Sequence, residues 1–223
     1  MIDAAGLTVT GRALATQGSS SDTILDAAAS LLRARRARGA VVDIGCGTGR
    51  FLDVSRDLVT SYIGVDIVRH GGLADDVMFV AANLDMETLP LEAACADVVV
   101  SLEVVEHLDH PRALFREAAR ICRPGGWLVV STPNQASFAN ALCLALRGYF
   151  VAFGPSSYPV HRTALLPIDL VRLSREHGFG GEAVVFSGRG RVPRTPLHYP
   201  RLVSRLVPRG CSDNVLVVAR RHA

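Results

Sequence analysis

A glycine-rich turn and the acidic residue that follows it are the residues best suited to chemistry. Residues 40–49 read AVVDIGCGTG, a short β-branched run that breaks into glycines. A strand that enters such a turn and then opens a helix presents backbone amides and a helix N-terminus to a ligand, and glycine lets the ligand approach the backbone. Asp66 ends the next apolar segment, where a carboxylate can accept hydrogen bonds from ribose hydroxyls. Together they predict a nucleoside-binding site.

The spacing of the glycines narrows the choice of nucleoside. Nicotinamide dinucleotide sites carry G-x-G-x-x-G, whereas this turn reads G-x-G-x-G, with Arg50 where the third dinucleotide glycine belongs. An arginine side chain there would obstruct the close packing of helix on strand that glycine permits. The spacing therefore disfavours a nicotinamide-dependent oxidoreductase, an alternative that tight NADH binding would revive.

The chain contains no lysine, because all 24 of its Lys and Arg residues are arginine. This excludes Walker A phosphate loops, protein kinases, pyridoxal-phosphate enzymes and Schiff-base aldolases, all of which need a lysine amine. The excess of arginine, together with the abundance of Ala, Gly and Val, is typical of a GC-rich genome. We interpret it as genomic rather than functional.

Apolar strand-like runs alternate with helical segments along the whole chain. The strand-like runs cover residues 40–44, 61–67, 77–83, 97–103, 127–133, 182–186 and 214–219, and the helical segments between them include 22–32, 50–59, 111–122 and 167–178. This alternation predicts one doubly wound α/β domain over residues 1–223, with a seven-stranded, mostly parallel sheet and helices on both faces. The hydrophobic content of 49% and mean hydropathy of +0.27 suit strands that are buried on both sides.

Apolar runs, the N-terminal segment and the cysteines bear on the cellular compartment of the protein. No run approaches the ~20 apolar residues of a membrane span, and the N-terminus lacks a basic start followed by an apolar core, as a signal peptide would have. The five cysteines are widely spaced and include no C-x-x-C pair. We therefore expect neither a disulfide framework nor a zinc site, and a cytoplasmic location.

Five ordered motifs resemble those of class I S-adenosylmethionine-dependent methyltransferases. They are VVDIGCGTGRFL, YIGVDI, FVAANLDMETLPL, DVVVSLEVVEHLDHP and ICRPGGWLVVSTPN, and the branch with the closest likeness is the small bacterial one that includes ubiquinone-biosynthesis O-methyltransferases. The resemblance implies a Rossmann-like fold with an antiparallel last strand, a lead-in at 1–39, a cofactor-binding core at 40–135 and acceptor-side elements at 136–223.

The resemblance also implies the reaction. The cofactor would be S-adenosylmethionine, which leaves as S-adenosylhomocysteine, and the expected activity is O-methylation of a small molecule in a biosynthetic pathway. N-methylation of a small molecule and a non-catalytic cofactor-binding subunit remain alternatives. The oligomeric state is not indicated.

Residues for the methionine end of the cofactor follow from the same resemblance. Asp43 would lie beneath the cofactor and act through water, and the backbone carbonyl of Ser101, just after the fourth strand, would accept from the cofactor's ammonium group. The turn residues would lie against the methionine part: Gly45, Cys46, Gly47 and Gly49.

At the adenosine end, Asp66 would hold the ribose hydroxyls and Ile67 would pack on the adenine. Asn83 would face the adenine amine, and the Leu84 backbone the ring nitrogen. The family usually has Asp where Asn83 stands and often Phe where Ala96 stands. An amide oxygen can still accept from the amine, so we expect binding to survive both departures.

The segment after the fourth predicted strand carries the catalytic candidates. His107 lies at the carboxyl edge of the sheet and is a candidate general base, although a capping or packing histidine is the alternative. Glu103 and Glu106, with His107 and the later His161, resemble the metal-binding pattern of small-RNA 2′-O-methyltransferases and some quinone O-methyltransferases. Because E-x-x-E-H also occurs in metal-free relatives, we assign no metal.

Two further regions bear on the acceptor. Aromatic residues and His161 in the segment 149–161 could form a wall for a planar or hydrophobic acceptor, or could pack beneath a loop. The arginine-rich stretch 188–209 could meet an anionic acceptor such as RNA. A solvated connection is favoured, since few aromatics are interleaved as single-strand nucleic-acid sites require.

Overall fold

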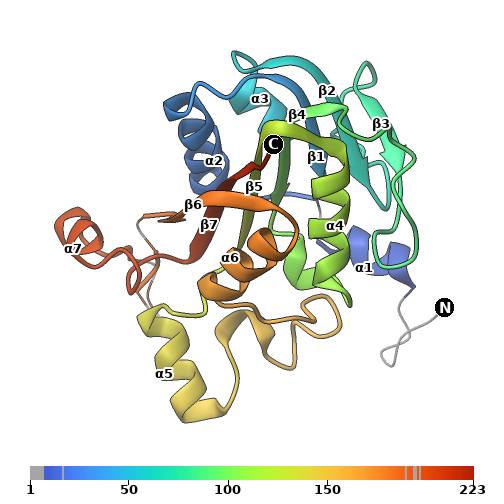
Figure 1. Ribbon diagram of the computed structural model, residues 1–223. Helices are drawn as coiled ribbons and strands as arrows, with labels where there is room; N and C mark the ends of the chain where they lie inside the picture. Colours follow the sequence, from blue (N-terminus) through green and yellow to red (C-terminus); the bar gives the residue numbers. More distant parts are fainter. Residues whose placement is uncertain (1–7, 17, 189, 193–194, 196) are drawn as a thin grey trace.

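Seven strands form one sheet in the order β3-β2-β1-β4-β5-β7-β6 (Figure 1). The computed structural model describes residues 8–16, 18–188, 190–192, 195 and 197–223. Strand β7 runs antiparallel to both of its neighbours, and the pairs among β1 to β5 are parallel, which confirms the predicted mixed sheet. The strands are β1 (Gly39–Ile44), β2 (Val59–Asp66), β3 (Met78–Ala81), β4 (Ala96–Leu102), β5 (Cys122–Pro133), β6 (Phe179–Phe186) and β7 (Asn214–Arg221).

Helices cover both faces of this sheet, as the alternating pattern predicts (Figure 1). Five of them, α3 to α7, lie between consecutive strands, as expected for a doubly wound fold. The helices are α1 (Val9–Ala15), α2 (Asp22–Ala34), α3 (Arg50–Ser55), α4 (Pro111–Ile121), α5 (Phe138–Arg147), α6 (Pro167–Glu176) and α7 (Arg201–Leu206), with 3-10 turns η1 (Val105–His107) and η2 (Val151–Phe153).

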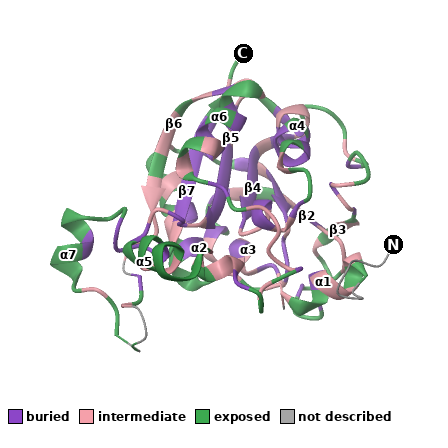
Figure 2. Ribbon diagram, turned by 90° about the horizontal axis from the view of Figure 1, so that it is seen from below, coloured by how far each residue is buried: buried purple, intermediate pink, exposed green. Residues whose placement is uncertain are grey.

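The core consists of two apolar clusters, one on each face of the sheet. Strand β4 shows why: Val98 and Val100 pack with α2, whereas Val99 packs in the cluster that contains residues of α4 and α6. Successive side chains of a strand point to opposite faces, so a strand covered on both sides must be apolar throughout. The central strands are accordingly buried (Figure 2).

Some element boundaries differ from the sequence-based expectation. The helix expected over 50–59 ends at Ser55, because the chain turns there to begin β2 at Val59. Residues 123–126, expected as a break after α4, belong to β5. Helix α7 lies inside the arginine-rich 188–209 stretch, for which the sequence predicts a solvated connection and no helix.

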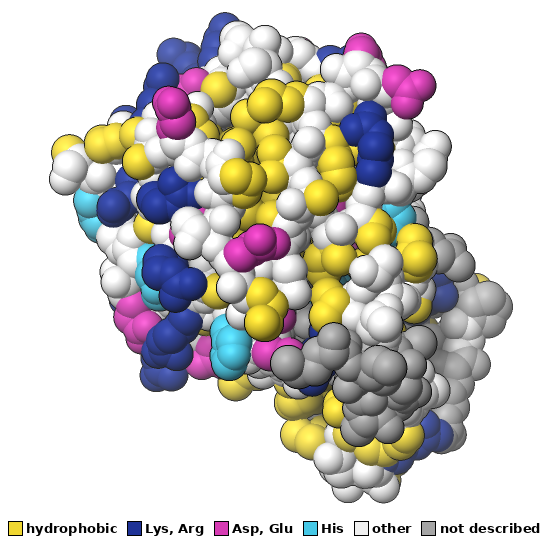
Figure 3. Space-filling model, turned by 90° about the vertical axis from the view of Figure 1, so that its right-hand side faces the viewer, with side chains coloured by type: hydrophobic (Ala, Val, Ile, Leu, Met, Phe, Trp, Pro, Cys, Tyr) yellow, Lys and Arg dark blue, Asp and Glu magenta, His cyan; other side chains and the backbone are white. Residues whose placement is uncertain are grey.

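The carboxyl ends of β1, β2 and β4 lie at one edge of the sheet, as parallel pairing of these strands requires. In an open α/β sheet that edge is where ligands bind. Across the face that carries α1 and β3, arginine and acidic side chains are interspersed (Figure 3), in keeping with the mild net charge of +3. Among the described residues, every helix is too short or too polar to traverse a bilayer.

Candidate functional site

The turn after β1 is held by its neighbours on both sides. The amides of Gly45 and Cys46 donate to the carbonyl of Val65, at 2.7 and 3.1 Å. Gly45 has φ +77°, and a Cβ there would lie 2.1 Å from the side chain of Val104. Glycine is therefore required at this position by both conformation and space.

Gly47 is constrained by a different segment, the chain that follows α1. With φ +52°, a Cβ on Gly47 would lie 2.1 Å from the carbonyl oxygen of Gly18. The amide of Thr48 donates to that same carbonyl at 2.9 Å. The second glycine of the motif thus lets Gly18 lie directly on the turn.

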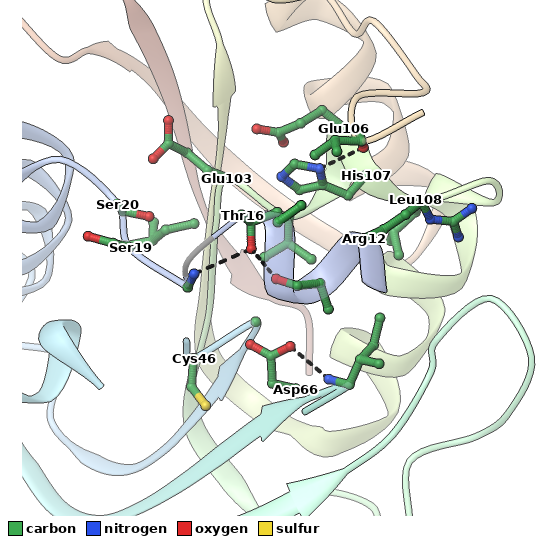
Figure 4. A pocket seen from close by; sticks show the side chains of 18 of the residues that line it. Arg12, Thr16, Ser19, Ser20, Cys46, Asp66, Glu103, Glu106, His107 and Leu108 are labelled. Carbon is green, nitrogen blue, oxygen red and sulfur yellow. Dashed lines mark hydrogen bonds between the residues drawn. The ribbon is translucent and has the colours of Figure 1, made fainter. Parts of the chain in front are cut away.

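Asp66 ends β2 and ties the turn to the next loop. Its Oδ2 accepts from the Gly47 amide at 3.0 Å. Its Oδ1 accepts from the Ile67 amide at 2.7 Å (Figure 4). The side chain is 14% exposed, and His70 Nε2 lies 4.0 Å away. A carboxylate has about four acceptor positions, so two remain for ligand hydroxyls.

Asp43, in β1, is buried beneath the turn. The hydroxyl of Tyr62 in β2 donates to its Oδ2 at 2.5 Å. Burial raises the pKa of the Asp43 carboxyl to about 7; the Tyr62 hydrogen bond opposes the shift and the charge of Asp66 adds to it. The sequence analysis missed Tyr62, because a tyrosine inside a strand carries no sign of its cross-strand partner.

The segment after β4 separates the four candidate metal ligands. Glu106, His107 and His161 lie together, with potential ligand atoms within 4.8 Å of one another. Glu103 turns away toward Ser20 (Figure 4), and the neighbouring Ser20 and Ser21 partly oppose the rise that burial causes in the pKa of its carboxyl. The pattern read from the sequence is thus brought together only in part.

A left-handed backbone explains where Glu103 points. Its φ is +56°, a conformation that non-glycine residues adopt at a cost and that occurs often at functional sites. Its amide donates to Ser131 Oγ at 3.0 Å, which holds the strand end in place. Burial raises the pKa of the Glu103 carboxyl.

His107 is a neutral imidazole with one nitrogen fixed. Its Nδ1 lies 2.8 Å from the backbone carbonyl of Val160, so Nδ1 carries the proton and Nε2 keeps its lone pair. Burial lowers the pKa of His107 to about 4, although the carbonyls of Val160 and Glu103 oppose this. The His161 ring lies 4.8 Å away, centroid to centroid.

Glu106 is the most deeply buried of these acids, at 1% exposure. Burial raises the pKa of its carboxyl to about 8. Thr132 Oγ1 donates to Glu106 Oε2 at 3.3 Å, and the Glu106 carbonyl accepts the amides of Arg162 and Thr163. Glu106 therefore connects the segment after β4 to the chain that carries His161.

The chain between α1 and α2 covers the site. Arg50, which follows the turn, donates to Ser19 Oγ at 3.2 Å and to the Ser20 carbonyl at 2.8 Å, and it pairs with Asp22. Arg50, which in the sequence argues against a dinucleotide site, thus holds the chain between α1 and α2 in place over the site. Its contacts could not be predicted, since they join positions about thirty residues apart.

These elements enclose a cavity of about 420 Å³ (Figure 4). Gly47, Gly49, Leu84 and Ser101 do not line it. Leu84 is buried in the core at 6% exposure, and Ser101 lies within β4 rather than after it, so Leu102 and Glu103 reach the cavity instead. The expected site residues that do line it are Asp43, Gly45, Cys46, Asp66, Ile67, Asn83 and His107.

Several lining residues were not foreseen. Arg12, Ala13 and Thr16 of the α1 region border the cavity, as do Ser157 and Val160 near His161. Nothing in the local pattern of residues 8–16 marks them as ligand-facing. Only the packing of α1 against the carboxyl edge of the sheet reveals their position.

The cavity fits an adenosyl cofactor. Its volume lies within the range of ~300–1,000 Å³ for small-molecule sites. It presents an acceptor carboxylate at Asp66, an apolar side chain at Ile67 and an amide at Asn83, which are the groups that a ribose and an adenine need. Fold and site together define the class: a Rossmann-like domain that binds a nucleoside at the carboxyl edge of its sheet.

Comparison with known proteins identifies the family. Residues 19–177 match the family model described as "Methyltransferase domain". The chain therefore belongs to this methyltransferase family. It is an enzyme that uses S-adenosylmethionine, as the sequence motifs predicted.

Relatives and solved structures agree with this assignment. The chain is 30% identical over 191 residues to a protein of Mycolicibacterium smegmatis named "Probable S-adenosylmethionine-dependent methyltransferase", covering 78% of this chain and 65% of that protein, just under two thirds of its length. It is 29% identical to a ubiquinone biosynthesis O-methyltransferase of Burkholderia pseudomallei, covering 82% and 78%. Its fold is similar to that of the 1,6-didemethyltoxoflavin-N1-methyltransferase of Burkholderia thailandensis, solved with S-adenosylhomocysteine, with a TM-score of 0.58, 18% identity and coverage of 96% and 83%.

Proposed function

We propose that this methyltransferase transfers a methyl group to a hydroxyl oxygen of a small-molecule acceptor in a biosynthetic pathway, in the cytoplasm. The observation that supports the proposal is the His107 imidazole, which lines the cavity together with Asp66 and whose Nδ1 lies against the Val160 carbonyl. Relatives named as ubiquinone biosynthesis O-methyltransferases support the choice of oxygen. The free state of all five cysteines is consistent with a reducing compartment.

The proposal gives each cofactor-binding residue a role that its place in the cavity supports. Asp66 accepts hydrogen bonds from the ribose hydroxyls, and Ile67 packs on the adenine that Asn83 faces. The backbone of Gly45 and Cys46 lies along the methionine part. Asp43 lies beneath, where its carboxylate would favour the cofactor's positive charge.

His107 then serves as the general base. When bound, S-adenosylmethionine supplies a methyl group attached to a positively charged sulfur. His107 Nε2 accepts the proton of the acceptor hydroxyl as that oxygen forms its bond to the methyl carbon, and the carbon–sulfur bond breaks with its electron pair on sulfur. The Val160 carbonyl accepts the hydrogen bond from His107 Nδ1–H throughout the transfer. This hydrogen bond stabilises the imidazolium that forms when Nε2 takes up the proton.

Because the pKa of His107 is about 4, the imidazole is already unprotonated at neutral pH. The base is therefore available over the whole physiological range. An imidazole with so low a pKa is a weak base and does not deprotonate the free acceptor hydroxyl. It takes the hydroxyl proton only as the acceptor oxygen forms its bond to the methyl carbon.

A screen of phenols, catechols and amines, read as S-adenosylhomocysteine formed, tests the proposal. We expect hydroxyl acceptors to be methylated, and His107→Ala to lower kcat at least a hundredfold without changing the dissociation constant for S-adenosylmethionine. His110→Ala, at an exposed position outside the cavity, is the matched control. Turnover of amines only, undiminished in His107→Ala, would replace O-methylation with N-methylation.

A further inference from the structure

Asp43 is a charged residue in a strand that is otherwise apolar. Every other residue of β1 is apolar or glycine, and the strand pairs with β2 on one side and β4 on the other. Asp43 is 3% exposed, yet it lines the cofactor cavity. A buried carboxylate is costly unless a cation or several hydrogen bonds compensate its charge. The partners of Asp43 therefore decide whether it carries a charge.

Tyr62 is the one side chain that donates to this carboxyl among the described residues. Its hydroxyl donates to Asp43 Oδ2 at 2.5 Å. Burial raises the pKa of Tyr62 well above its usual value, so the hydroxyl keeps its proton and remains a donor at every pH used below. No residue in the described part of the chain donates a hydrogen bond to the other oxygen, Oδ1, which leaves that oxygen for a ligand.

No cation of the described residues compensates the charge of Asp43. The influences on the pKa of its carboxyl are burial, the Tyr62 hydrogen bond and the negative charge of Asp66. Neither arginine that lines the cavity, Arg12 or Arg50, is among them. Burial and Asp66 outweigh the hydrogen bond, and the pKa is about 7. The carboxyl therefore lacks a positive partner, and a ligand in the cavity can supply one.

Other titratable groups surround the same cavity. Burial and the charges of Asp43 and Asp66 raise the pKa of the Cys46 thiol, so this neighbour stays neutral. Asp53 acts on Tyr62, and His70 lies 4.0 Å from Asp66. The remaining acids and histidines that line the cavity are Asp85, Glu103, Glu106, His107 and His161. All of these groups remain in a variant of Asp43, so a comparison of that variant with the wild type isolates the contribution of Asp43.

We propose that Asp43, held by Tyr62, makes the cofactor site selective for charge, so that it binds the sulfonium of S-adenosylmethionine more tightly than the thioether of S-adenosylhomocysteine. The two ligands differ by one methyl group and one positive charge. Once the methyl group has been transferred, the sulfur is neutral and the attraction to Asp43 is lost, which favours release of the product. The proposal rests on the place given to Asp43 under the proposed function and not on the choice of acceptor.

The expected pH dependence follows from the charges. A nearby cation lowers the pKa of a carboxyl by about 1–3 units, so S-adenosylmethionine favours the ionised form of Asp43. Its affinity therefore rises as pH increases through the pKa of about 7. S-adenosylhomocysteine, with a neutral sulfur, gains nothing from this ionisation. Near neutral pH, binding of S-adenosylmethionine displaces the Asp43 proton to solvent.

Titration calorimetry with the two ligands at pH 5.5, 7 and 8.5 tests the proposal. If the cation lowers the Asp43 pKa by about one unit, the ratio of the two association constants, S-adenosylmethionine over S-adenosylhomocysteine, rises about sevenfold from pH 5.5 to 8.5. We expect a rise of at least about fivefold in the wild type and none attributable to this residue in Asp43→Asn. The control is Asp57→Asn, at an exposed position outside the cavity, which should keep the full rise.

Tyr62→Phe tests the positioning residue. Its hydrogen bond lowers the pKa of Asp43, so its loss should move the rise in the ratio to higher pH. At pH 7 the variant should bind S-adenosylmethionine about threefold more weakly and S-adenosylhomocysteine as well as the wild type does, which also shows that the variant is folded. A purely structural role for Tyr62 would weaken both ligands equally. Tyr158→Phe is the matched control, because Tyr158 is 53% exposed and outside the cavity.

Proton release is a second readout. Titrations at pH 7 in phosphate and in Tris, two buffers with different heats of ionisation, give the number of protons released on binding. A fall of the Asp43 pKa from about 7 to about 6 releases about 0.4 proton per chain. This release should appear with S-adenosylmethionine in the difference between wild type and Asp43→Asn, and should be absent with S-adenosylhomocysteine. The amino group of each ligand titrates with either protein, so its contribution cancels in the difference.

Three results would overturn the proposal. They are a ratio of association constants that varies with pH in Asp43→Asn as it does in the wild type, an equal loss of both ligands in Tyr62→Phe, and equal proton release with both ligands. Methyl transfer is not the readout. A protein that shows the charge selectivity but methylates no hydroxyl would refute O-methylation alone, and active O-methylation without the selectivity would refute the role of Asp43 and Tyr62 alone.

Discussion

Replacement of Asp43 by asparagine should make the protein more stable at alkaline pH. Asp43 is 3% exposed, and burial raises the pKa of its carboxyl from 3.8 to about 7. Below pH 3.8 the carboxyl is protonated in both states and carries no penalty. As pH rises the unfolded chain releases the proton first, so stability is lost progressively until pH passes the folded pKa.

The size of this effect follows from the two pKa values. At 1.36 kcal/mol for each pKa unit, the loss for a carboxyl that moves from 3.8 to about 7 is about 4 kcal/mol above pH 8, of which roughly 2–3 kcal/mol falls between pH 5 and pH 8. Asparagine has nearly the same shape and an oxygen that can accept from Tyr62, but it does not titrate. The free energy of unfolding of the variant minus that of the wild type should therefore rise by this amount over that range.

Urea unfolding at pH 5, 6, 7 and 8 without cofactor measures this difference. The other titrating groups contribute equally to both proteins, so their contributions cancel in the difference. The new amide can shift the free energy of unfolding by a constant, which does not change how the difference varies with pH. Asp57→Asn is the control: Arg33 lowers the pKa of this exposed carboxyl, so that variant should gain no stability as pH rises. A difference for Asp43→Asn that stays constant to within about 0.5 kcal/mol, well below the rise expected from linkage, would refute an abnormal pKa for Asp43.

Three further predictions concern the cofactor and its surroundings. Asp66→Ala should weaken S-adenosylmethionine binding, measured by calorimetry, at least tenfold, which is about 1.4 kcal/mol. The control is Asp75→Ala, which should leave binding unchanged because Asp75 is exposed and outside the cavity. Unchanged binding in Asp66→Ala would falsify the ribose assignment. Arg50→Ala removes the contacts to Ser19 and Ser20, so amide exchange in residues 18–22 should quicken while exchange in β4 stays the same. Methyl transfer should persist in a chelator, because the proposed base needs no metal; activity that is lost and then restored by Mg²⁺, Mn²⁺ or Zn²⁺ would show that the cluster at Glu106 holds one.

Local pattern was sufficient for the sheet and for part of the lining of the cavity. Gly45 and Asp66 were found because each stands at the end of a strand whose β-branched run is visible in the sequence, and parallel strands bring such ends to one edge. Ser101 was placed after the strand rather than inside it, since the apolar run alone does not mark where pairing stops. The residues that reach the cavity are instead the next two, Leu102 and Glu103.

The sequence by itself determined the family, the cofactor and the order of elements, because these depend on motifs of neighbouring residues and on hydrophobic periodicity. Only the tertiary structure decided that Gly18 lies on Gly47, that Arg50 anchors the covering segment, and that Glu103 departs from Glu106 and its histidines. The hollow between α5 and the chain at Arg191 also belongs to this second group, since its walls are about fifty residues apart in the chain. Such contacts join segments that are distant in the sequence, and the local pattern of one segment does not indicate which other segment it contacts. Only the packing of the whole chain brings them together.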